Sequence, residues 1–453
     1  MQLEVIVLAA GQGTRMKSRI PKVLHSVGGK PMLERVLGTV SSLLPARVHV
    51  VTSDDDEEIQ SRFEQFDIDW VYQEEQLGTG HAVLQALPLL EANSQALVVY
   101  GDCPLVKPDT LKRCVAENHG GIALITAVVP DPFGLGRIIR DTTGQVEAIV
   151  EQADISPEQC GIDEINTGIL STSAELLGEY LPQLNDNNAQ GEIYLTDLIV
   201  EAVSNGVSVK AVQVDDYRET LGVNDRMQLA KVERVFQQWQ AEALMKQGVS
   251  IADPSRVDCR GSVTTGLDCV LDINVLLEGD IELGDNVRIG ANCVLRNVQI
   301  ASDTVINENS VIEDTTIGRA CSVGPFARIR PGSALDDNVS IGNFVEVKNS
   351  RLAGGVKAGH LAYLGDAEIG ADTNIGAGAI TCNFDGKNKH RTIIGDNVFI
   401  GSNSSLIAPL TIESGAAVAA GSSISRNVNT DALVIERADQ RNIKGGGTRF
   451  RRR

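Results

Sequence analysis

A glycine-rich turn with a cluster of cations stands near the start of the chain. The segment LAAGQGTRM follows an apolar run directly, so Gly11 and Gly13 are expected at the carboxyl end of a strand, where open α/β sheets bind ligands. Glycines let backbone amides approach phosphate oxygens, and nearby cations neutralise their charge. The cations are Arg15, Lys17, Arg19 and Lys22. The turn is therefore a candidate phosphate-binding loop, and a solvated basic turn is the alternative.

Two oxygen-bearing side chains lie further along the same half of the chain. The run ALVVYGD ends in Asp102, again at the expected carboxyl end of a strand. A lone acid there can cap a turn or hold a metal. Mg²⁺ takes one or two protein oxygens and completes its shell with water and substrate phosphates. Asn224, in LGVND, supplies a second oxygen, so Asp102 and Asn224 are the candidate ligands for Mg²⁺.

A histidine lies inside an interruption of a sequence repeat in the second half. Around His360, in AGHLAYLGD, the small residues Ala353, Gly359 and Gly365 stand where the repeat predicts large aliphatics. We expect this loss of bulk, together with a loop over 381–391, to open a cleft. A lone histidine is more often structural than catalytic, but histidine is suited to general-base catalysis. Arg330 and Lys348 bracket the region, and their charges suit a phosphate.

The repeat itself predicts how the second half folds. An aliphatic residue returns at every sixth position, a period that fits neither a helix nor an isolated strand and is typical of the hexapeptide parallel β-helix. Glycines directly follow many of these aliphatics, as at Gly318 and Gly342, and we expect corners with positive φ there. The two clean runs are Ile317, Val323, Ile329, Leu335, Ile341, Val347 and Ile394, Ile400, Leu406, Ile412, Val418, Ile424.

The first half alternates apolar strands with helical patterns, which predicts a doubly wound, Rossmann-like α/β domain with a mostly parallel sheet. Apolar residues then follow at helical spacing, at Leu229, Val232, Phe236 and Trp239. They predict a single connecting helix. We therefore divide the chain into an α/β domain at 1–226, a helical linker at 227–247 and a left-handed parallel β-helix at 248–453.

Composition limits the function classes. The net charge of −20 disfavours nucleic acid as a partner. The eight cysteines show no metal-ligand spacing, and no apolar run is long enough to cross a bilayer. The opening MQLEVIVLAA is typical of a buried strand and not of a signal peptide. A reducing cytoplasm is the predicted setting.

Several motifs occur together in a specific order. They are LAAGQGTRMKS followed by PK, then QLGTGHA, VYGD, IVEQ, INTGI and LGVND. In this order they look like a sugar-nucleotide pyrophosphorylase domain. With the hexapeptide repeat behind it, the whole chain resembles the bacterial bifunctional N-acetylglucosamine-1-phosphate uridyltransferase and glucosamine-1-phosphate N-acetyltransferase. The resemblance implies two activities in UDP-N-acetylglucosamine synthesis, which supplies peptidoglycan and lipopolysaccharide precursors.

The resemblance assigns residues to the first activity, Mg²⁺-dependent uridyl transfer from UTP to N-acetylglucosamine-1-phosphate. Arg15 and Lys22 would stabilise charge on the phosphates, and Asp102 and Asn224 would hold Mg²⁺. The remaining nucleotide- and sugar-binding residues would be Leu8, Ala9, Ala10, Gly11, Gln73, Gly78, Thr79, Tyr100, Gly101, Gly136, Glu151 and Asn166.

The resemblance also assigns residues to acetyl transfer from acetyl-CoA to glucosamine-1-phosphate. His360 would be the general base, with Glu346 a candidate for orienting it or the amine. The family commonly has tyrosine at the position of Phe384. Sugar binding would involve Arg330, Lys348, Tyr363 and Asn374, and acetyl-CoA binding would involve Ala377, Asn383, Phe384, Ser402, Ala420 and Arg437. The family assembles three β-helices, so the resemblance implies a homotrimer.

Two other functions fit parts of the sequence. A monofunctional sugar-1-phosphate nucleotidyltransferase could use a non-catalytic β-helix only for assembly, but a spacer needs neither His360 nor the loop over 381–391. A regulatory protein built on a degenerate transferase fold would be expected to lose Lys22, Asp102 or Asn224, and all three are present. Contact of the basic tail with RNA is disfavoured by the overall charge.

Overall fold

The computed structural model describes residues 2–53, 57–188, 191–447 and 451. They form two compact units, residues 1–236 and 237–453. Helix α7 (Arg226–Lys246) includes the residues on both sides of this boundary. Part of the basic tail, Thr448–Phe450 with Arg452 and Arg453, lies outside the described residues. No helix of the described ranges has the length and apolar character needed to span a membrane.

A twisted, mostly parallel sheet forms the centre of the first unit. Strands β6, β1, β4 and β5 are parallel neighbours, and β7 is parallel to β11. Strand β10 runs antiparallel between β6 and β7, and the β8–β9 hairpin extends from it. The order is β11 (Val209–Gln213), β7 (Ile122–Val128), β10 (Glu164–Ser173), β6 (Gln95–Tyr100), β1 (Leu3–Leu8), β4 (Arg47–Thr52) and β5 (Asp69–Tyr72), with β8 (Arg137–Arg140) and β9 (Val146–Val150) outside this path.

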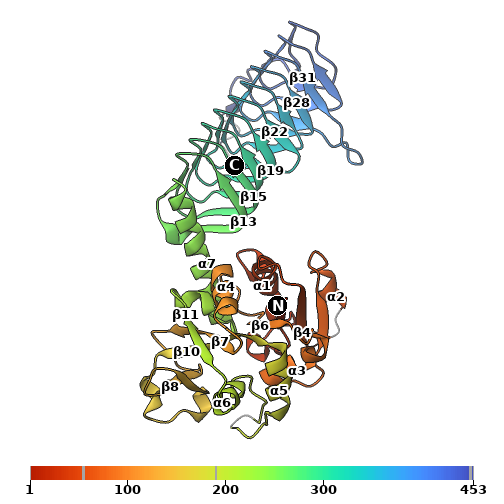
Figure 1. Ribbon diagram of the computed structural model, residues 1–453. Helices are drawn as coiled ribbons and strands as arrows, with labels where there is room; N and C mark the ends of the chain where they lie inside the picture. Colours follow the sequence, from red (N-terminus) through yellow and green to blue (C-terminus); the bar gives the residue numbers. More distant parts are fainter. Residues whose placement is uncertain (1, 54–56, 189–190, 448–450, 452–453) are drawn as a thin grey trace. The chain divides into compact units, whose positions relative to one another are not determined.

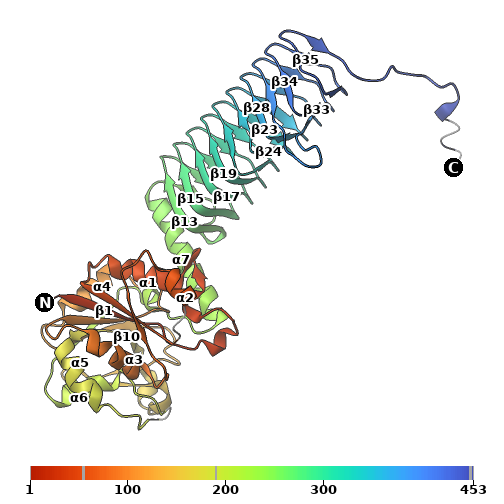
Figure 2. The same cartoon turned by 90° about the vertical axis from the view of Figure 1, so that its right-hand side faces the viewer.

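Helices cover both faces of this sheet (Figure 2). Val5 and Val7 of β1 pack in one core with α1 (Met32–Ser41), α2 (Glu57–Ser61) and α4 (Pro108–Ala116). Ile6 and Leu8 point to the other face, towards α3 (Thr79–Ala86), α5 (Ala174–Tyr180) and α6 (Asp197–Ser204). Because successive side chains of a strand alternate between faces, a strand covered on both sides must be apolar throughout. The predicted doubly wound α/β unit is confirmed.

The second unit is a parallel β-helix, as predicted (Figure 1). All twelve aliphatics of the two period-six runs are buried and line the interior of the coils. The strands that carry the candidate site are β21 (Arg328–Ile329), β23 (Ser340–Asn343), β24 (Glu346–Lys348), β26 (Lys357–His360), β27 (Tyr363–Gly365), β29 (Asn374–Ile375), β30 (Ile380–Cys382), β31 (Thr392–Ile394), β32 (Phe399–Ile400), β33 (Ser405–Ile407) and β35 (Ala417–Val418).

The long first coils of this unit are made by β13 (Val257–Thr265), β15 (Val275–Leu283), β17 (Val294–Ile300) and β19 (Val311–Ile317). Each pairs in parallel with the next, so the backbone hydrogen bonds of one coil are satisfied by its neighbours. Buried cysteines, among them Cys259 and Cys293, fill part of the interior as small apolar side chains.

The predicted loss of bulk around His360 is wrong. Ala353, Gly359 and Gly365 do not replace interior aliphatics, because Leu352, Ala358 and Leu364 fill the interior instead. The coil here is 17 residues long rather than 18, as the pairing of Leu335 with Leu352 shows. The frame therefore moves by one residue and the core stays closed. The loop over 381–391 lengthens the next coil to 25 residues between Ile369 and Ile394.

The prediction of positive φ at the glycine corners also fails at most positions. Of those glycines, Gly324 has a positive φ of 97°, while Gly318 and Gly342 do not. A Cβ on Gly342 would lie 1.8 Å from the carbonyl oxygen of Gly359 on the next coil. Glycine is thus needed for close stacking of coils. The left-handed corners are taken instead by residues such as Asn286, Asn309 and Asn403, because Asn tolerates this conformation.

Candidate functional site

The carboxyl edge of the first sheet holds a cavity of about 550 Å³. It is bounded by the ends of β1 and β6, the glycine loop and the start of α3. Twelve of the predicted residues line it: Leu8, Ala9, Ala10, Gly11, Arg15, Lys22, Gln73, Gly78, Thr79, Tyr100, Asp102 and Asn224. Residues from the first 22 positions and from position 224 thus meet at one edge, as the rule for open α/β sheets predicts.

Lys22 joins the two predicted metal ligands. Its Nζ lies 2.5 Å from Asp102 Oδ2 and 3.2 Å from Asn224 Oδ1. The side chains of Lys22 and Asp102 are only 11% and 15% exposed, so water screens their attraction weakly. Two oxygens from distant segments therefore already converge on one cation. This donor set fits Mg²⁺, which binds few protein oxygens. Among the described residues, no group of three or more His, Cys, Asp or Glu side chains is placed to hold a metal ion.

Two glycines with positive φ shape the cavity, Gly13 in the glycine loop and Gly78 before α3. Gly13 has φ 59°, and a Cβ there would lie 2.8 Å from the Cβ of Lys22. Gly78, before α3, has φ 114°, and a Cβ would lie 2.5 Å from the carbonyl oxygen of Ile193. Both residues line the cavity. Any larger residue would push the Lys22 segment or the 192–195 segment away from it.

Polar side chains on the far side of the cavity are held by one another. Gln73 is buried, and its Nε2 donates to the carbonyl of Gly78 at 3.3 Å and lies 2.9 Å from His81 Nδ1. Gln12 Nε2 donates to Gln76 Oε1 at 2.9 Å. Gln76 and Glu192 also line the cavity and were not among the predicted residues. Gln76 opens the motif QLGTGHA, which could have pointed to it, whereas Glu192 stands in none of the quoted motifs and is revealed only by the fold.

Four predicted residues do not line this cavity. Gly101 donates its backbone N–H to the carbonyl of Leu8 at 2.9 Å and joins β6 to β1. Asn166 lines a smaller neighbouring cavity, which shares Tyr100 with the first. Its backbone N–H donates to the carbonyl of Gly136. A Cβ on Gly136 would lie 3.3 Å from both carboxylate oxygens of Glu151, so these residues form a second cluster beside Tyr100.

Glu151 is one of the acids of this unit whose pKa is raised by burial. Burial raises the pKa of its carboxyl group, although Thr196 Oγ1 donates to Glu151 Oε1 at 3.2 Å. Burial, and next the charge of Asp102, also raise the pKa of the Tyr100 hydroxyl. Tyr100 therefore remains a neutral hydrogen-bonding group.

In the second unit His360 is exposed at the end of β26. Its Nδ1 lies 2.8 Å from Asn343 Oδ1 on the preceding coil, and the two residues pair in register. An amide oxygen can only accept, so Nδ1 carries the proton and Nε2 is free to accept one. Glu346, expected as a partner of His360 or the amine, instead accepts from Arg330 Nη1 at 2.8 Å. The orienting residue is Asn343, which sequence reasoning missed.

Sugar-site candidates stand on adjacent coils. Glu346 and Lys348 of β24 pair with Tyr363 and Gly365 of β27, and Arg330 donates its backbone N–H to the carbonyl of Val347. A Cβ on Gly365 would lie 2.4 Å from Tyr363 Oη, so Tyr363 lies across a position that only glycine leaves open. Asn374 begins β29 and pairs with Lys357. The hydrogen bond with Glu346 raises the pKa of Arg330, which keeps its positive charge.

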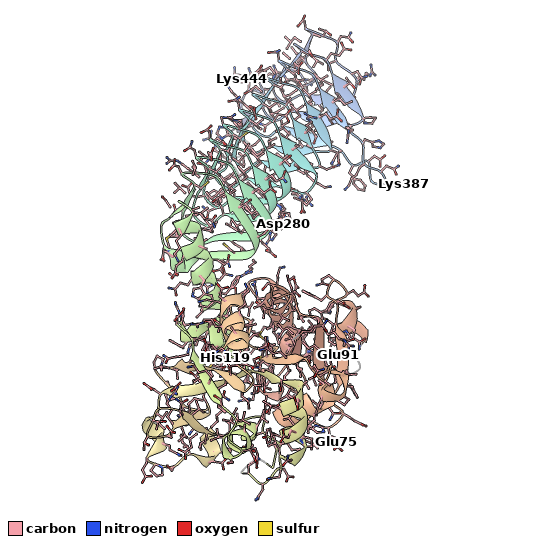
Figure 3. All side chains as sticks on the ribbon, in the orientation of Figure 1. Glu75, Glu91, His119, Asp280, Lys387 and Lys444 are labelled. Carbon is pink, nitrogen blue, oxygen red and sulfur yellow. The ribbon has the colours of Figure 1, made fainter. Side chains whose placement is uncertain are left out.

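The loop over 381–391 brings a further cation to this cluster. Lys389 lies beside Lys348, and this neighbour lowers the pKa of Lys389. Asp366 is buried and accepts from Asn349 and Asn383 at 2.5 Å each. Burial raises the pKa of Asp366, but these hydrogen bonds and the lysine charges together lower it. Two neighbouring lysines could hold an anion here. Figure 3 shows Lys387 at the end of this loop, which projects from the coils.

The predicted acetyl-CoA residues fall into two groups. The pairing of β26, β29, β32 and β35 puts Ala377, Ser402 and Ala420 on successive coils in line with His360. Arg437 Nη1 donates to the carbonyl of Ala420 at 2.7 Å. Asn383 and Phe384 lie in the loop, with Phe384 59% exposed. A row of small residues beside a histidine could accept an extended ligand.

Comparisons with known proteins agree with this geometry. Residues 5–142 match a MobA-like NTP transferase domain, and residues 280–314 and 391–426 match the hexapeptide repeat of succinyl-transferase. Proteins named bifunctional protein GlmU match along nearly the whole chain. The relative from Acinetobacter baylyi is 52% identical over 97% of this chain and 97% of its own length.

The chain belongs to the family of bifunctional GlmU proteins. Further GlmU relatives, from Alkalilimnicola ehrlichii and Pseudomonas entomophila, are each 50% identical over 98% of this chain, and cover 96% and 98% of their own lengths. The predicted family and fold class are thereby confirmed. The match of two different domains to one bifunctional GlmU chain also disfavours a β-helix that serves only for assembly.

Proposed function

We propose that the chain makes UDP-N-acetylglucosamine from glucosamine-1-phosphate in two steps, one in each unit. The β-helix transfers an acetyl group from acetyl-CoA to glucosamine-1-phosphate. The α/β unit then transfers a uridyl group from UTP to N-acetylglucosamine-1-phosphate and releases pyrophosphate. The observation that carries the proposal is that each unit gathers its own chemically complete set of side chains: Lys22, Asp102 and Asn224 in one, and Asn343, His360 and the cluster around Lys348 in the other.

Uridyl transfer needs little from the protein beyond positioning and charge neutralisation. A phosphate oxygen of the sugar phosphate attacks the α-phosphorus of UTP, and the bond to the β-phosphate oxygen breaks. Arg15 and Lys22 line the cavity where the triphosphate would lie and neutralise the charge on the departing pyrophosphate. Gly11 and Gly13 let backbone amides reach phosphate oxygens. Gln73, Gly78 and Thr79 line the opposite side, as candidates for the uracil.

Asp102 and Asn224 are the residues that would hold Mg²⁺. The metal, when bound, would neutralise negative charge on the phosphate oxygens as the bond from the α-phosphorus to the leaving oxygen breaks. Tyr100, Asn166 and Glu151 form the adjoining cluster, which suits the acetylated sugar. Thr196 positions Glu151 by a hydrogen bond, and Glu151 would accept a hydrogen bond from a sugar hydroxyl.

Acetyl transfer requires a neutral amine. The amino group of glucosamine-1-phosphate is largely protonated at neutral pH, since a model α-amino group has a pKa of about 7.7 to 8.0. His360 Nε2 takes the proton as the nitrogen attacks the thioester carbon. The carbon–sulfur bond then breaks, and the sulfur takes the proton from His360, so that coenzyme A leaves as the thiol. Arg330, Lys348 and Lys389 would hold the sugar phosphate, while Phe384 would pack against the cofactor without the hydroxyl of the family's tyrosine.

The assembly proposed is a homotrimer, working in the cytoplasm. The candidate acetyl-CoA row lies on an open face of the β-helix. Large apolar side chains are also exposed there, including Phe326 and Phe344, whose ring centroids stack at 5.3 Å. A neighbouring copy would cover both. Sedimentation of a monomer at micromolar concentration would count against the trimer.

An omission experiment tests the two activities together. The purified protein is incubated with glucosamine-1-phosphate, acetyl-CoA, UTP and Mg²⁺, and products are separated by chromatography. We expect UDP-N-acetylglucosamine only in the complete mixture, and N-acetylglucosamine-1-phosphate when UTP or Mg²⁺ is left out. Formation of UDP-glucosamine instead of the acetylated product, or no acetylated sugar at all, would contradict the proposal.

A further inference from the structure

The start of helix α7 contacts the segment that carries Lys22. Arg226, its first residue, donates from Nε to the carbonyl of Met16 at 3.2 Å, and its Nη1 lies 3.3 Å from His25 Nδ1. Met16 ends the short helix of the glycine loop, and His25 directly follows the one that contains Lys22. One guanidinium therefore contacts both ends of the segment 17–24, which projects Lys22 into the cavity.

His25 is suited to this contact only in its neutral form. A guanidinium has no acceptor atom, so His25 Nδ1 must accept from Arg226 and the proton stands on Nε2. His25 is 7% exposed, and its Nε2 is buried without a hydrogen-bond partner among the described residues. Burial, and next the charge of Arg226, lower the pKa of His25. The backbone of His25 is fixed too, because its carbonyl accepts from the N–H of Met32 in α1.

Other contacts hold α7 in place independently of Arg226. Glu233 Oε2 accepts from the backbone N–H of Gly28 at 2.6 Å. The guanidinium of Arg35 lies 3.8 Å from the centroid of the Phe236 ring. A Cβ on Gly28 would lie 2.1 Å from that ring, so the helix and this turn are tightly packed. Removal of the Arg226 guanidinium should therefore free the 17–24 segment without releasing the helix.

The turn before α7 also contributes Asn224 to the site. Its Oδ1 bonds to Lys22, and its backbone N–H donates to Gln228 Oε1 at 2.7 Å. Asn224, in the turn before α7, thus places an oxygen in the site. Arg226, two residues later, connects α7 to the glycine loop. Met16, His25 and Arg226 do not line the cavity, so any effect on catalysis must pass through Lys22 and the loop.

We infer that Arg226 and His25 are positioning residues for uridyl transfer, which hold the glycine loop and Lys22 in register with Asp102 and Asn224. This inference rests on the proposed function of the first unit. Residues of this kind, which orient a site without touching substrate, typically cost 10- to 100-fold in activity when removed. The bridge from Met16 through Arg226 to His25 likewise orients the glycine loop and Lys22 without lining the cavity.

The test compares four single variants of the full-length chain and the double variant Arg226→Gln/His25→Leu. Arg226→Gln removes the bridge, and His25→Leu removes the acceptor, while His25→Asn keeps an oxygen near the position of Nδ1. Lys231→Gln is the matched control, because Lys231 is an exposed cation on the same helix and does not line the cavity. Each variant is assayed for uridyl transfer with UTP, N-acetylglucosamine-1-phosphate and Mg²⁺, for acetyl transfer, and for thermal unfolding.

We expect Arg226→Gln and His25→Leu to lower kcat for uridyl transfer by about 10- to 100-fold while KM for UTP changes by less than about threefold. His25→Asn should recover most of kcat, and acetyl transfer and the unfolding temperature should stay at wild-type values. The double variant should be no slower than the slower single variant, because both changes break one bridge. Wild-type kcat in Arg226→Gln, or an equal loss in Lys231→Gln, would overturn the inference.

Hydrogen exchange separates this inference from the proposed function. In Arg226→Gln the amides of residues 13–25 should exchange faster than in the wild type, and those of β6 should not change. If the wild type performs no uridyl transfer, the proposed function fails while faster exchange in the variant still supports the bridge. Unchanged exchange over residues 13–25 would contradict the bridge whatever the activity.

Discussion

At the scale of single residues, the two sites solve different electrostatic problems. In the α/β unit a partly buried ammonium, Lys22, is balanced by the carboxylate of Asp102 and the amide oxygen of Asn224. A bound polyphosphate adds negative charge to this cluster. The cavity must therefore supply more positive than negative groups to neutralise the polyphosphate. In the β-helix the neutral imidazole of His360 must accept a proton, and Asn343 fixes the tautomer that allows it.

Asp102→Asn should remove uridyl transfer and spare acetyl transfer. The substitution keeps the size of the side chain but removes the charge that balances Lys22 and would bind Mg²⁺. We expect kcat/KM for uridyl transfer to fall by about 100-fold or more, with acetyl transfer within about twofold of wild type. Initial rates of both reactions on one preparation measure this. Full uridyl transfer at saturating Mg²⁺ would rule out a metal role for Asp102.

His360→Ala should have the opposite effect. Loss of a general base typically lowers a rate by about 100-fold or more, so acetyl transfer should fall by at least that factor while uridyl transfer is kept. Asn343→Ala should give a smaller loss, because it frees the imidazole without removing it. Coenzyme A release, followed with a thiol reagent, measures the rate. Wild-type acetylation by His360→Ala would show that another group takes the proton.

At the scale of elements, close stacking of coils supports the acetyl-transfer site. Gly342, beside Asn343, lies against the carbonyl of Gly359, beside His360. The pair Asn343–His360 therefore stands next to a close contact between two coils. The sequence predicted the coils and the place of the interruption, since period six is a property of the chain alone. It could not predict which neighbour His360 contacts, because the change from 18 to 17 residues alters the register between coils.

Gly342→Ala should destabilise the β-helix. A methyl group there would lie 1.8 Å from the Gly359 carbonyl oxygen, and such overpacking typically costs about 1–3 kcal/mol. Gly359→Ala is the matched control, because a Cβ at Gly359 meets nothing within 4 Å. Thermal unfolding of both variants, with acetyl transfer measured at 25 °C, tests this. Equal stability of the two would mean that the coils are not packed so closely here.

The strands of the α/β sheet are joined by a buried acid, which predicts a pH dependence. Glu4 on β1 is fully buried, and it accepts from His49 Nε2 on β4 at 2.9 Å and from the Glu91 N–H at 2.9 Å. Burial raises the pKa of Glu4, but these hydrogen bonds outweigh burial and lower it below the ordinary value of 4.5. A lowered pKa stabilises the fold above the unfolded value and loses that stabilisation as pH falls through the folded value.

Glu4→Gln should therefore cost about 1–3 kcal/mol of unfolding free energy at pH 7, because hydrogen bonds to a charged group are replaced by neutral ones. The difference from wild type should shrink as the pH falls below 4.5, since the wild-type carboxylate is then protonated as well. Urea unfolding followed by tryptophan fluorescence at several pH values measures this. If the difference in unfolding free energy between the wild type and Glu4→Gln grew as the pH fell, the proposed effect of pH would be wrong.

At the scale of the whole molecule, each unit was predictable to a different depth. The order of apolar strands predicted the α/β fold, and the position of Gly11 and Asp102 at strand ends predicted that they would meet at one edge of the sheet. Lys22 was predicted as one of a cluster of cations, and Asn224 as a second oxygen for the metal. The resemblance supplied Gly136, Glu151 and Asn166, whose cluster depends on the antiparallel β10 and the β8–β9 hairpin. No local sequence pattern predicts the roles of Lys389 and Asn343. Their neighbours, Lys348 and His360, come close to them only when the coils form.

The two sites draw on different units, so their activities should be separable and restorable by mixing. Asp102→Asn and His360→Ala, each purified, are incubated alone and together with glucosamine-1-phosphate, acetyl-CoA, UTP and Mg²⁺, and UDP-N-acetylglucosamine is measured. The account predicts little product from either variant alone and near wild-type synthesis from the mixture, since one variant acetylates and the other transfers uridyl groups. A mixture that makes no more product than its components would contradict the assignment of one complete activity to each unit.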